Sequence, residues 1–105
     1  MTDKIKKLSA KEAECRIKEL LELGYFRKVP HVYEQMEKRN YCDLDIIKVL
    51  SKGKVKEPPI YDEKFNNWKC RVEGSATEGE KTIVLVAIQN HEELVCITIM
   101  DKLEG

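Results

Sequence analysis

The stretch Ile83-Val84-Leu85-Val86-Ala87-Ile88 is an uninterrupted apolar run, rich in β-branched residues, in a chain of 105 residues of which 36% are charged. A run of this length and composition predicts a strand at the centre of a sheet. Before it, Trp68 to Val72 alternates apolar and polar residues; after it, Leu94 to Met100 is rich in valine and isoleucine. The polar turn Asn90-His91 joins the last two strands as a hairpin.

A fourth strand is expected to begin within Lys54 to Tyr61, ahead of these three. Pro58 and Pro59 have no N–H group to donate to a ladder, so this strand belongs at a sheet edge. Asp62 to Asn67 is then a turn.

Three helices are expected before the strands. Ser9-Ala-Lys-Glu12 is a capping box that opens a helix over residues 10–23, which ends at Gly24. A second helix is expected over about 30–39, because proline suits the first helical position and Asn40 can end the helix in the left-handed conformation.

The third helix is expected over about 44–52, with Asp43 as its cap and Gly53 at its end. Tyr25 to Val29 is expected to link the first two helices. Helices followed by strands give an α+β fold, with three N-terminal helices packed on one face of a four-stranded antiparallel sheet. The length suits one domain over residues 1–105.

The charge is balanced, with 19 basic and 19 acidic residues and a pI near 6.7, whereas dedicated nucleic-acid binders are usually basic. Any phosphate-binding role therefore needs a local basic patch. The four cysteines form no C-x-x-C pair, which argues against zinc-ribbon and thioredoxin-like proteins and favours a reduced, cytoplasmic setting. We expect no signal peptide and no membrane span, because the N-terminus lacks an apolar region and no apolar stretch approaches about 20 residues.

The second helix carries a polar edge that suggests chemistry. At about 100° per residue, His31, Gln35 and Arg39 fall within roughly 80° of one another. The adjoining sector is apolar and includes Met36. A titratable imidazole, an amide and a fixed cation thus share one edge, while the neighbouring edge can be buried.

Several short motifs in order resemble a known family over roughly residues 8–101. They are Leu20-Leu-Glu-Leu-Gly24, His31-x-x-x-x-Met36-x-x-Arg39, Asp45-Ile46-x-x-Val49-Leu50-x-x-Gly53-x-Val55, Trp68-x-x-x-Val72 and Ile97-Thr98-Ile99. This order resembles a widespread family of small prokaryotic domains of unassigned function that is grouped with the RelE-like and MqsR-like toxin ribonucleases. The chain departs from that family at Gln35, where an arginine is usual, and at Asn40, where a glycine is usual.

The resemblance implies a toxin-like, metal-independent endoribonuclease, an mRNA interferase of a toxin–antitoxin pair. Such cleavage needs a base, an acid and positive groups around the phosphorane. His31 is the candidate base or acid, since the unperturbed pKa of histidine, near 6.5, is close to the working pH. Arg39 and Arg71 are candidate phosphate clamps, and Thr98 is a candidate hydroxyl donor.

RNA binding would involve a further set of residues. Lys54 and Lys56 would add positive potential, Lys69 shares a strand face with Arg71, and Tyr61 could stack on a base. If the helices cover the face that carries Trp68, then Lys69 and Arg71 point away from them. We expect RNA and an antitoxin protein as partners, no cofactor, and contact with neither a membrane nor DNA directly.

The alternative function is a non-catalytic protein- or RNA-binding module, which the neutral charge and Gln35 favour. A structural role also exists for each candidate: His31 as a helix-start hydrogen bonder, Arg39 as an ion-pair partner of Asp43 or Asp45, and Thr98 as a group satisfied within the sheet. Lys69 and Arg71 would then be a solvated strand face. A metalloenzyme is disfavoured, because no His/Asp/Glu cluster has ligand spacing.

Overall fold

The computed structural model describes residues 8–89 and 92–102. The predicted turn at Asn90-His91 and the basic residues before Leu8 lie outside these ranges. In the described ranges, the helices and strands follow one another along the chain as α1 (Ala10–Leu23), β1 (Phe26–Lys28), α2 (Pro30–Arg39), α3 (Asp43–Lys52), β2 (Lys54–Val55), β3 (Ile60–Asp62), β4 (Asn67–Ser75), β5 (Lys81–Gln89) and β6 (Glu93–Asp101).

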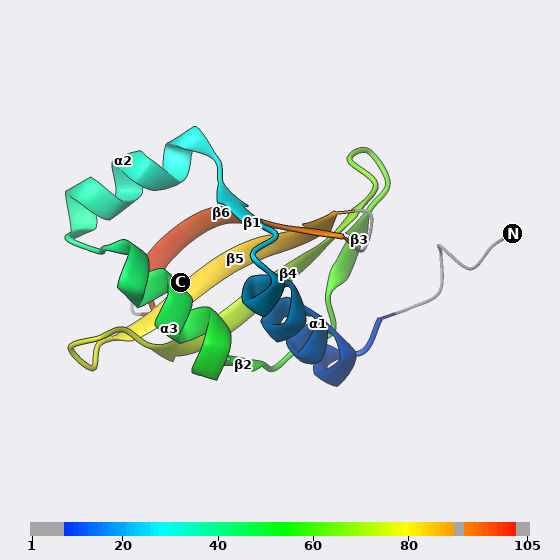
Figure 1. The fold of residues 1–105 in the computed structure, drawn as a ribbon, viewed down its shortest axis with the longest axis horizontal. Helices are drawn as coiled ribbons and strands as arrows, with labels where there is room; N and C mark the ends of the chain where they lie inside the picture. The colour runs from blue at the N-terminus through cyan, green and yellow to red at the C-terminus, as the bar shows by residue number, and fades with distance from the viewer. Residues whose placement is uncertain (1–7, 90–91, 103–105) are drawn as a thin grey trace, which may run out of the picture.

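The architecture is α+β, but the sheet is not the expected four-stranded antiparallel one. It has six strands, in the order β1-β6-β5-β4-β2, and β3 also pairs with β4 (Figure 1). It is mixed, because β1 runs parallel to β6 while the other pairs are antiparallel. The prediction that Ile83 to Ile88 forms a central strand is confirmed, since β5 lies between β4 and β6.

Strand β1 occupies a segment that was expected to be a linker. Its ladder with β6 includes Leu94 N–H donating to the Tyr25 carbonyl at 2.8 Å and Val29 N–H donating to the Cys96 carbonyl at 3.2 Å. A three-residue strand is too short to show a periodic pattern, so its partner, more than 60 residues away, decides its conformation. The expected edge strand over 54–61 is instead two short strands, β2 and β3, which pair with different parts of β4 on either side of Pro58 and Pro59.

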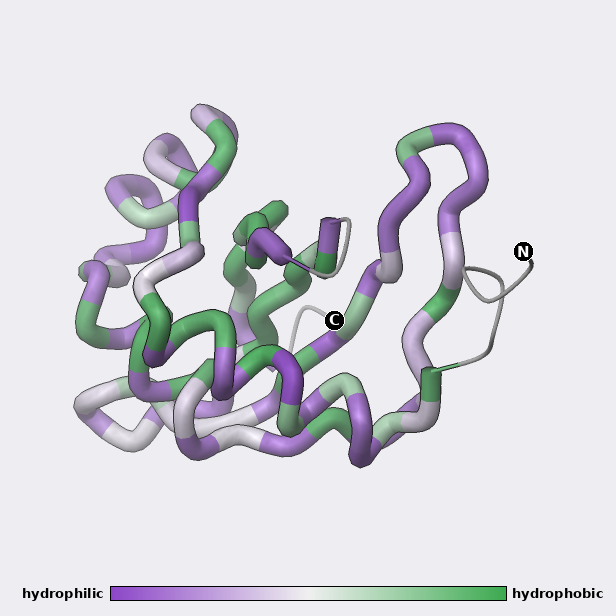
Figure 2. The backbone as a smooth tube through the Cα atoms, turned by 45° about the vertical axis from the view of Figure 1, so that its right-hand side comes forward, coloured by the Kyte–Doolittle hydropathy of each residue, from purple (hydrophilic) through white to green (hydrophobic). Residues whose placement is uncertain are grey.

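All three helices lie on one side of the sheet, and α1 and α3 stand in front of it in Figure 1. Their apolar faces pack on alternate sheet residues. The hydrophobic and hydrophilic colours alternate along the helices in Figure 2, as expected of helices with one buried face. The largest fully buried side chains include Ile17, Ile46, Ile88, Leu94 and Ile99. No helix in the described part of the chain combines the length and the apolar character needed to cross a membrane.

The expected helix ends are largely confirmed. Ser9 and Glu12 form the capping box of α1, with N–H to side-chain distances of 2.9 and 3.1 Å. Gly24 and Asn40 adopt left-handed conformations, with φ of 85° and 64°. The cap of α3 differs, because Asp43 was expected there and Cys42 holds the position.

Asp45, rather than Asp43, accepts the side-chain hydrogen bond at the start of α3. Its carboxylate accepts the Cys42 N–H at 2.8 Å and the N–H and hydroxyl of Thr77 at 2.9 and 2.7 Å. Asp43 instead pairs with Lys28, whose Nζ lies 2.6 Å from its Oδ1. Asp45 therefore ties α3 to the β4–β5 loop as well as capping the helix.

The end of α3 approaches β4 closely because two glycines meet there. A Cβ atom on Gly53 would lie 2.4 Å from the Val49 carbonyl oxygen and 2.6 Å from that of Glu73. A Cβ atom on Gly74 would lie 3.2 Å from the Gly53 Cα. Gly53 is therefore required by space rather than by backbone conformation.

Helix α2 lies along the free edge of β6 beyond the end of β1. The Gln35 Oε1 atom accepts hydrogen bonds from the Thr98 hydroxyl and, at 3.2 Å, from the Ile99 N–H. Because β1 pairs only with residues 94–96, Gln35 supplies the acceptor that the next part of the β6 edge needs.

Replacing Gln35 tests this attachment. Gln35→Ala leaves the hydroxyl of buried Thr98 and a strand N–H without their acceptor, so we expect a loss of about 1–3 kcal/mol in the free energy of unfolding. Urea unfolding followed by circular dichroism measures it. Glu34→Ala, which removes an exposed side chain of the same helix, is the control, and equal stability of the two variants would contradict the role of Gln35.

Acid stability tests the Asp45 cap. Burial opposes ionisation of Asp45, but hydrogen bonds from Cys42 and Thr77 outweigh it and hold the pKa of the carboxyl below its usual value. The carboxylate therefore stabilises the fold above the unfolded pKa of about 3.9, and this contribution is lost as the pH falls through the lower folded pKa.

We expect the free energy of unfolding of Asp45→Asn to be about 1–2 kcal/mol below that of the parent protein at pH 7. Between pH 4 and pH 2, we expect the free energy of unfolding to fall less in Asp45→Asn than in the parent protein. Chemical unfolding measured across this pH range checks both parts. Asp43→Asn is the matched control at the helix start, and a variant as acid-sensitive as the parent would overturn the assignment.

Candidate functional site

The sheet side away from the helices carries the exposed cations predicted from the sequence. We call it the open face; by alternation and strand register its residues include Arg27, Lys54, Ile60, Asp62, Asn67, Lys69, Arg71, Glu73, Ile83, Leu85, Ala87, Gln89, Glu93, Val95, Thr98 and Met100. Trp68, Cys70 and Val72 point to the helices and join the core. The expectation that Lys69 and Arg71 point away from the helices is thus confirmed.

A groove of about 370 Å³ crosses the open face. Ile60, Leu85 and Ile97 supply apolar surface, while Lys69 and Arg71 bring positive charge to it. Ile60 is 73% exposed, which is high for a large apolar side chain. Glu57 adds one carboxylate to the lining, so the two cations leave an excess of one positive charge, and the groove suits a ligand with flat apolar parts and negative charge.

Beside the groove, three cations surround the single carboxylate of Glu73. Lys102 Nζ and Lys56 Nζ lie 2.8 and 3.3 Å from Oε1, and Arg71 Nε lies 3.4 Å from Oε2. The Lys102 ammonium, followed by that of Lys56, holds the pKa of the Glu73 carboxyl below its usual value. One carboxylate balances one of three positive charges, so this basic cluster (Lys56, Arg71, Lys102 and Glu73) keeps an excess of two.

The basic cluster reaches across three strands of the sheet. Lys102 follows β6 and its Nζ reaches Glu73 on β4, so its side chain spans β5. Ile83, the residue of β5 that pairs with Glu73, is only 1% exposed.

At the other end of the groove, Lys69 is held by the β3–β4 turn. Its Nζ lies 2.8 Å from Asp62 Oδ2 and 5.3 Å from the centre of the Phe65 ring. The Lys69 ammonium lowers the pKa of the Asp62 carboxyl. Lys69 and Arg71 are therefore both ion-paired, and a bound anion would have to share them with these carboxylates.

The helix residues predicted for catalysis lie apart from this groove. His31 is exposed in the first turn of α2, with Nδ1 4.0 Å from Glu34 Oε1, and Arg39 is the half-buried last residue of the helix. Eight residues of helix separate them by about 12 Å along its axis. Gln35 lies between them and contacts β6.

Thr98 connects α2 to the open face, but its hydroxyl is engaged. Arg71, Leu85 and Thr98 are register partners on three successive strands, so the Arg71 and Thr98 backbones are about 10 Å apart. The Thr98 hydroxyl donates to Gln35, and the side chain is buried. The structure thus spreads His31, Arg39, Arg71 and Thr98 over a surface rather than around one point.

The residues predicted for RNA binding are also divided between the groove and other places. Lys69 lines the groove, Lys56 lies beside it in the basic cluster, and Lys54 lies at the edge of the open face opposite Glu73. Tyr61 turns to the helix side, where its ring centre is 5.0 Å from that of Trp68 and its hydroxyl donates to Asn66. The sequence analysis missed Glu73, Lys102 and Phe65; an exposed phenylalanine in an otherwise polar turn was the available signal for the last.

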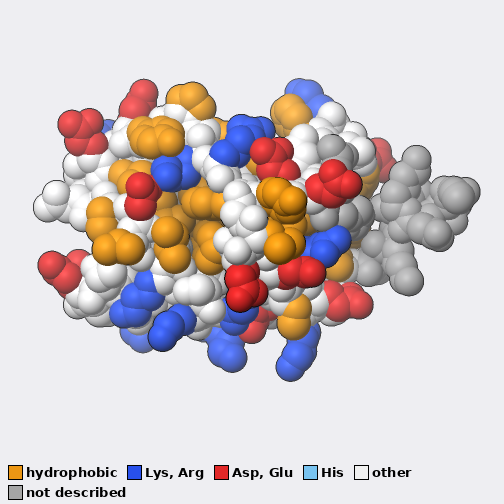
Figure 3. Space-filling model, viewed as in Figure 1, with side chains coloured by type: hydrophobic (Ala, Val, Ile, Leu, Met, Phe, Trp, Pro, Cys, Tyr) orange, Lys and Arg blue, Asp and Glu red, His pale blue; other side chains and the backbone are white. Residues whose placement is uncertain are grey.

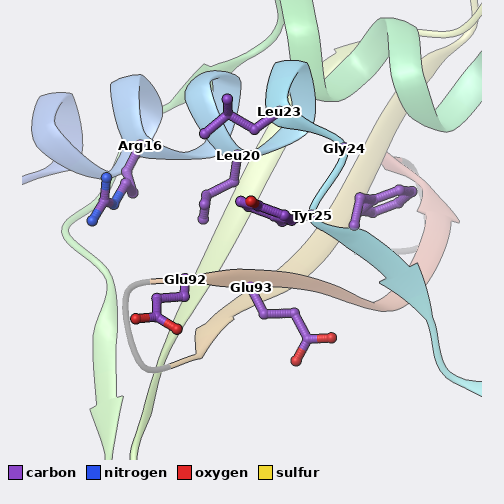
Figure 4. A pocket seen from close by; sticks show the side chains of 8 residues that line it. Arg16, Leu20, Leu23, Gly24, Tyr25, Glu92 and Glu93 are labelled. Carbon is purple, nitrogen blue, oxygen red and sulfur yellow. The ribbon is translucent and has the colours of Figure 1, made fainter.

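A second hollow, of about 830 Å³, lies between the end of α1 and the start of β6 (Figure 4). Leu20, Leu23 and Tyr25 line it from one side, and Glu92 and Glu93 line it from the other. Acidic and basic side chains are mixed over the helix side of the molecule (Figure 3). None of the residues predicted for catalysis or RNA binding lines this hollow, so the open face is the stronger candidate site.

The basic cluster can be tested with a simple anion. Glu73→Gln leaves its three cations unbalanced, so we expect inorganic tripolyphosphate to bind about two- to fivefold more tightly at low salt. Isothermal titration calorimetry measures the affinity. Glu93→Gln, which removes the partner of Arg27 on the same face, is the control; tighter binding in that variant alone would place the anion elsewhere.

Among residues 8–89 and 92–102, no group of three or more His, Cys, Asp or Glu side chains could hold a metal ion.

Comparison with known proteins assigns the chain to a family whose function is unknown. Searches of the curated proteins and of the solved structures found no match. The model of one family, described as a domain of unknown function (DUF4258), matches residues 30–101, from the start of α2 to the end of β6. Since this match covers well over half of the sequence, the chain belongs to the DUF4258 family.

Proposed function

We propose that this protein binds RNA through the open face of its sheet, as a cytoplasmic RNA-binding domain. The observation that carries the proposal is the basic cluster, where Lys56, Arg71 and Lys102 share the single carboxylate of Glu73. Phosphate groups are the ligands that lysine and arginine clusters recruit, and such contacts supply most of the sequence-independent affinity for nucleic acids.

The balanced charge of the whole chain is compatible with this function. A protein with 19 basic and 19 acidic residues has no strong overall field, so affinity depends on where the excess charge lies. On the open face the excess lies at one end of a groove with apolar walls. We expect moderate affinity that falls steeply as the salt concentration rises.

A second candidate function is the toxin-like endoribonuclease that the sequence resemblance implies, with an antitoxin as its partner. The exposure of His31, whose side chain is 63% accessible, favours it. His31 lies one helical turn from Gln35, which contacts Thr98 on the open face. A strand of RNA that continues from the groove over the edge of β6 would reach the imidazole, with Arg39 as a phosphate clamp farther along α2.

RNA binding is tested by fluorescence anisotropy with a labelled RNA of mixed sequence at several salt concentrations. We expect Arg71→Glu to weaken binding at least tenfold, because it removes one cation and adds a second carboxylate to the basic cluster. Arg16→Glu on α1 is the matched control. No RNA binding by the parent protein at low salt, or equal loss in both variants, would refute the proposal.

The same RNA, incubated with the protein in EDTA, separates the two candidate functions. Cleavage that His31→Ala abolishes while binding persists would establish the endoribonuclease. Binding without cleavage would establish the non-catalytic module. Expression in a bacterial host adds a second readout, since growth arrest relieved by His31→Ala is expected only of a nuclease.

A further inference from the structure

Phe65 is an exposed aromatic side chain held in a fixed turn. It lies in the tip of the β3–β4 hairpin, which stands clear of the helices in Figure 1 and Figure 2. Asp62 Oδ1 accepts the N–H groups of Lys64 and Phe65 at 3.0 and 3.4 Å, and Asn66 takes the left-handed conformation with φ of 53°. The backbone is thereby fixed, while 55% of Phe65 stays exposed.

Two lysines make cation–π contacts with the Phe65 ring. Lys69 Nζ and Lys64 Nζ lie over the ring, 5.3 and 5.5 Å from its centre. A base that stacks on this ring takes the place of an ammonium group, which is then free to pair with the neighbouring phosphate. Proteins that bind single-stranded nucleic acids use this combination.

Lys69 also connects Phe65 to the groove. Its side chain lines the groove together with Ile60 and Arg71, so a ligand that touches Phe65 and follows Lys69 enters the groove. Along β4, Lys69, Arg71 and Glu73 stand about 6.8 Å apart in succession, since alternate residues of a strand share a face. The path from Phe65 through the groove therefore ends at the basic cluster.

We propose that Phe65 stacks on an unpaired base of the RNA and that the groove takes the next nucleotide, so that the protein selects single-stranded RNA over duplex. This inference rests on the proposed RNA-binding function and names its substrate class. The faces of paired bases inside an A-form helix are covered by their neighbours, and its deep major groove is too narrow for side chains to read. A duplex could meet the lysines and Arg71 but could not stack a base on Phe65.

The test compares three labelled probes of equal length by fluorescence anisotropy: a single-stranded RNA, its duplex, and an oligomer with the same ribose-phosphate backbone but no bases. We expect Phe65→Ala to weaken binding of the single strand about fivefold and to leave the abasic oligomer unchanged. Phe65→Trp is expected to restore or raise the affinity for the single strand. Because the ring is exposed, these variants are expected to keep the fold, which circular dichroism checks.

Tyr33 on α2 is the matched control. Its exposure is 56%, and Lys28 Nζ lies 5.2 Å from its ring centre, but it has no connection to the groove. Tyr33→Ala is therefore expected to bind all three probes as the parent protein does. Equal loss in Tyr33→Ala and Phe65→Ala would overturn the assignment to Phe65.

The outcomes separate this inference from the function on which it rests. Binding of single strand and duplex with equal affinity, or loss of abasic-oligomer binding in Phe65→Ala, would overturn the stacking role while leaving RNA binding in place. Failure of the parent protein to bind any of the probes would refute the proposed function itself.

Discussion

The hydrogen bonds that Gln35 accepts from Thr98 and Ile99 fix the relation between α2 and the sheet. Strand β1 covers only the first part of the β6 edge, and a bare edge beyond it would leave strand groups unpaired. One side-chain oxygen supplies the missing acceptor and at the same time holds α2 along that edge. Because His31 and Arg39 lie one turn to either side of Gln35, their places on the surface follow from this attachment.

The division of the sheet into two faces follows from burial on one side only. The helices cover the face that carries Trp68, Cys70 and Val72, which frees the alternate residues of β4 for charge. On the open face, Lys102 spans β5 to reach Glu73 on β4. The same ion pair thus links the end of β6 to β4 and brings a positive charge to this face.

Local signals allowed much of the fold to be predicted. The helix ends at Gly24 and Asn40, the central place of β5 and the outward direction of Lys69 and Arg71 all follow from residues close together in the sequence. Strand β1 could not be predicted, because its pairing depends on β6 rather than on its own three residues. The cap of α3 was assigned to Asp43 because Asp and Asn are preferred caps, whereas contacts with Thr77, a residue of a distant loop, select Asp45.

The candidate site was predictable only where strand alternation decides it. The engagement of Thr98 by Gln35 joins residues 63 positions apart, and the reach of Lys102 to Glu73 depends on the order of strands in the sheet. Neither contact produces a pattern in the nearby sequence from which it could be predicted. The orientation of Tyr61 was not predictable for a related reason, since the register of β3 with β4 turns its ring toward Trp68.

The parallel pairing of β1 with β6 also has a consequence for biosynthesis. The ribosome makes the chain from its N-terminus, so β1 and α2 emerge long before the strand to which both attach. Contacts of such large sequence separation form late and slowly, because a long loop must close first. A nascent chain that stops short of β6 has neither the attachment of α2 nor a complete open face, so any activity of this surface awaits the translation of β6.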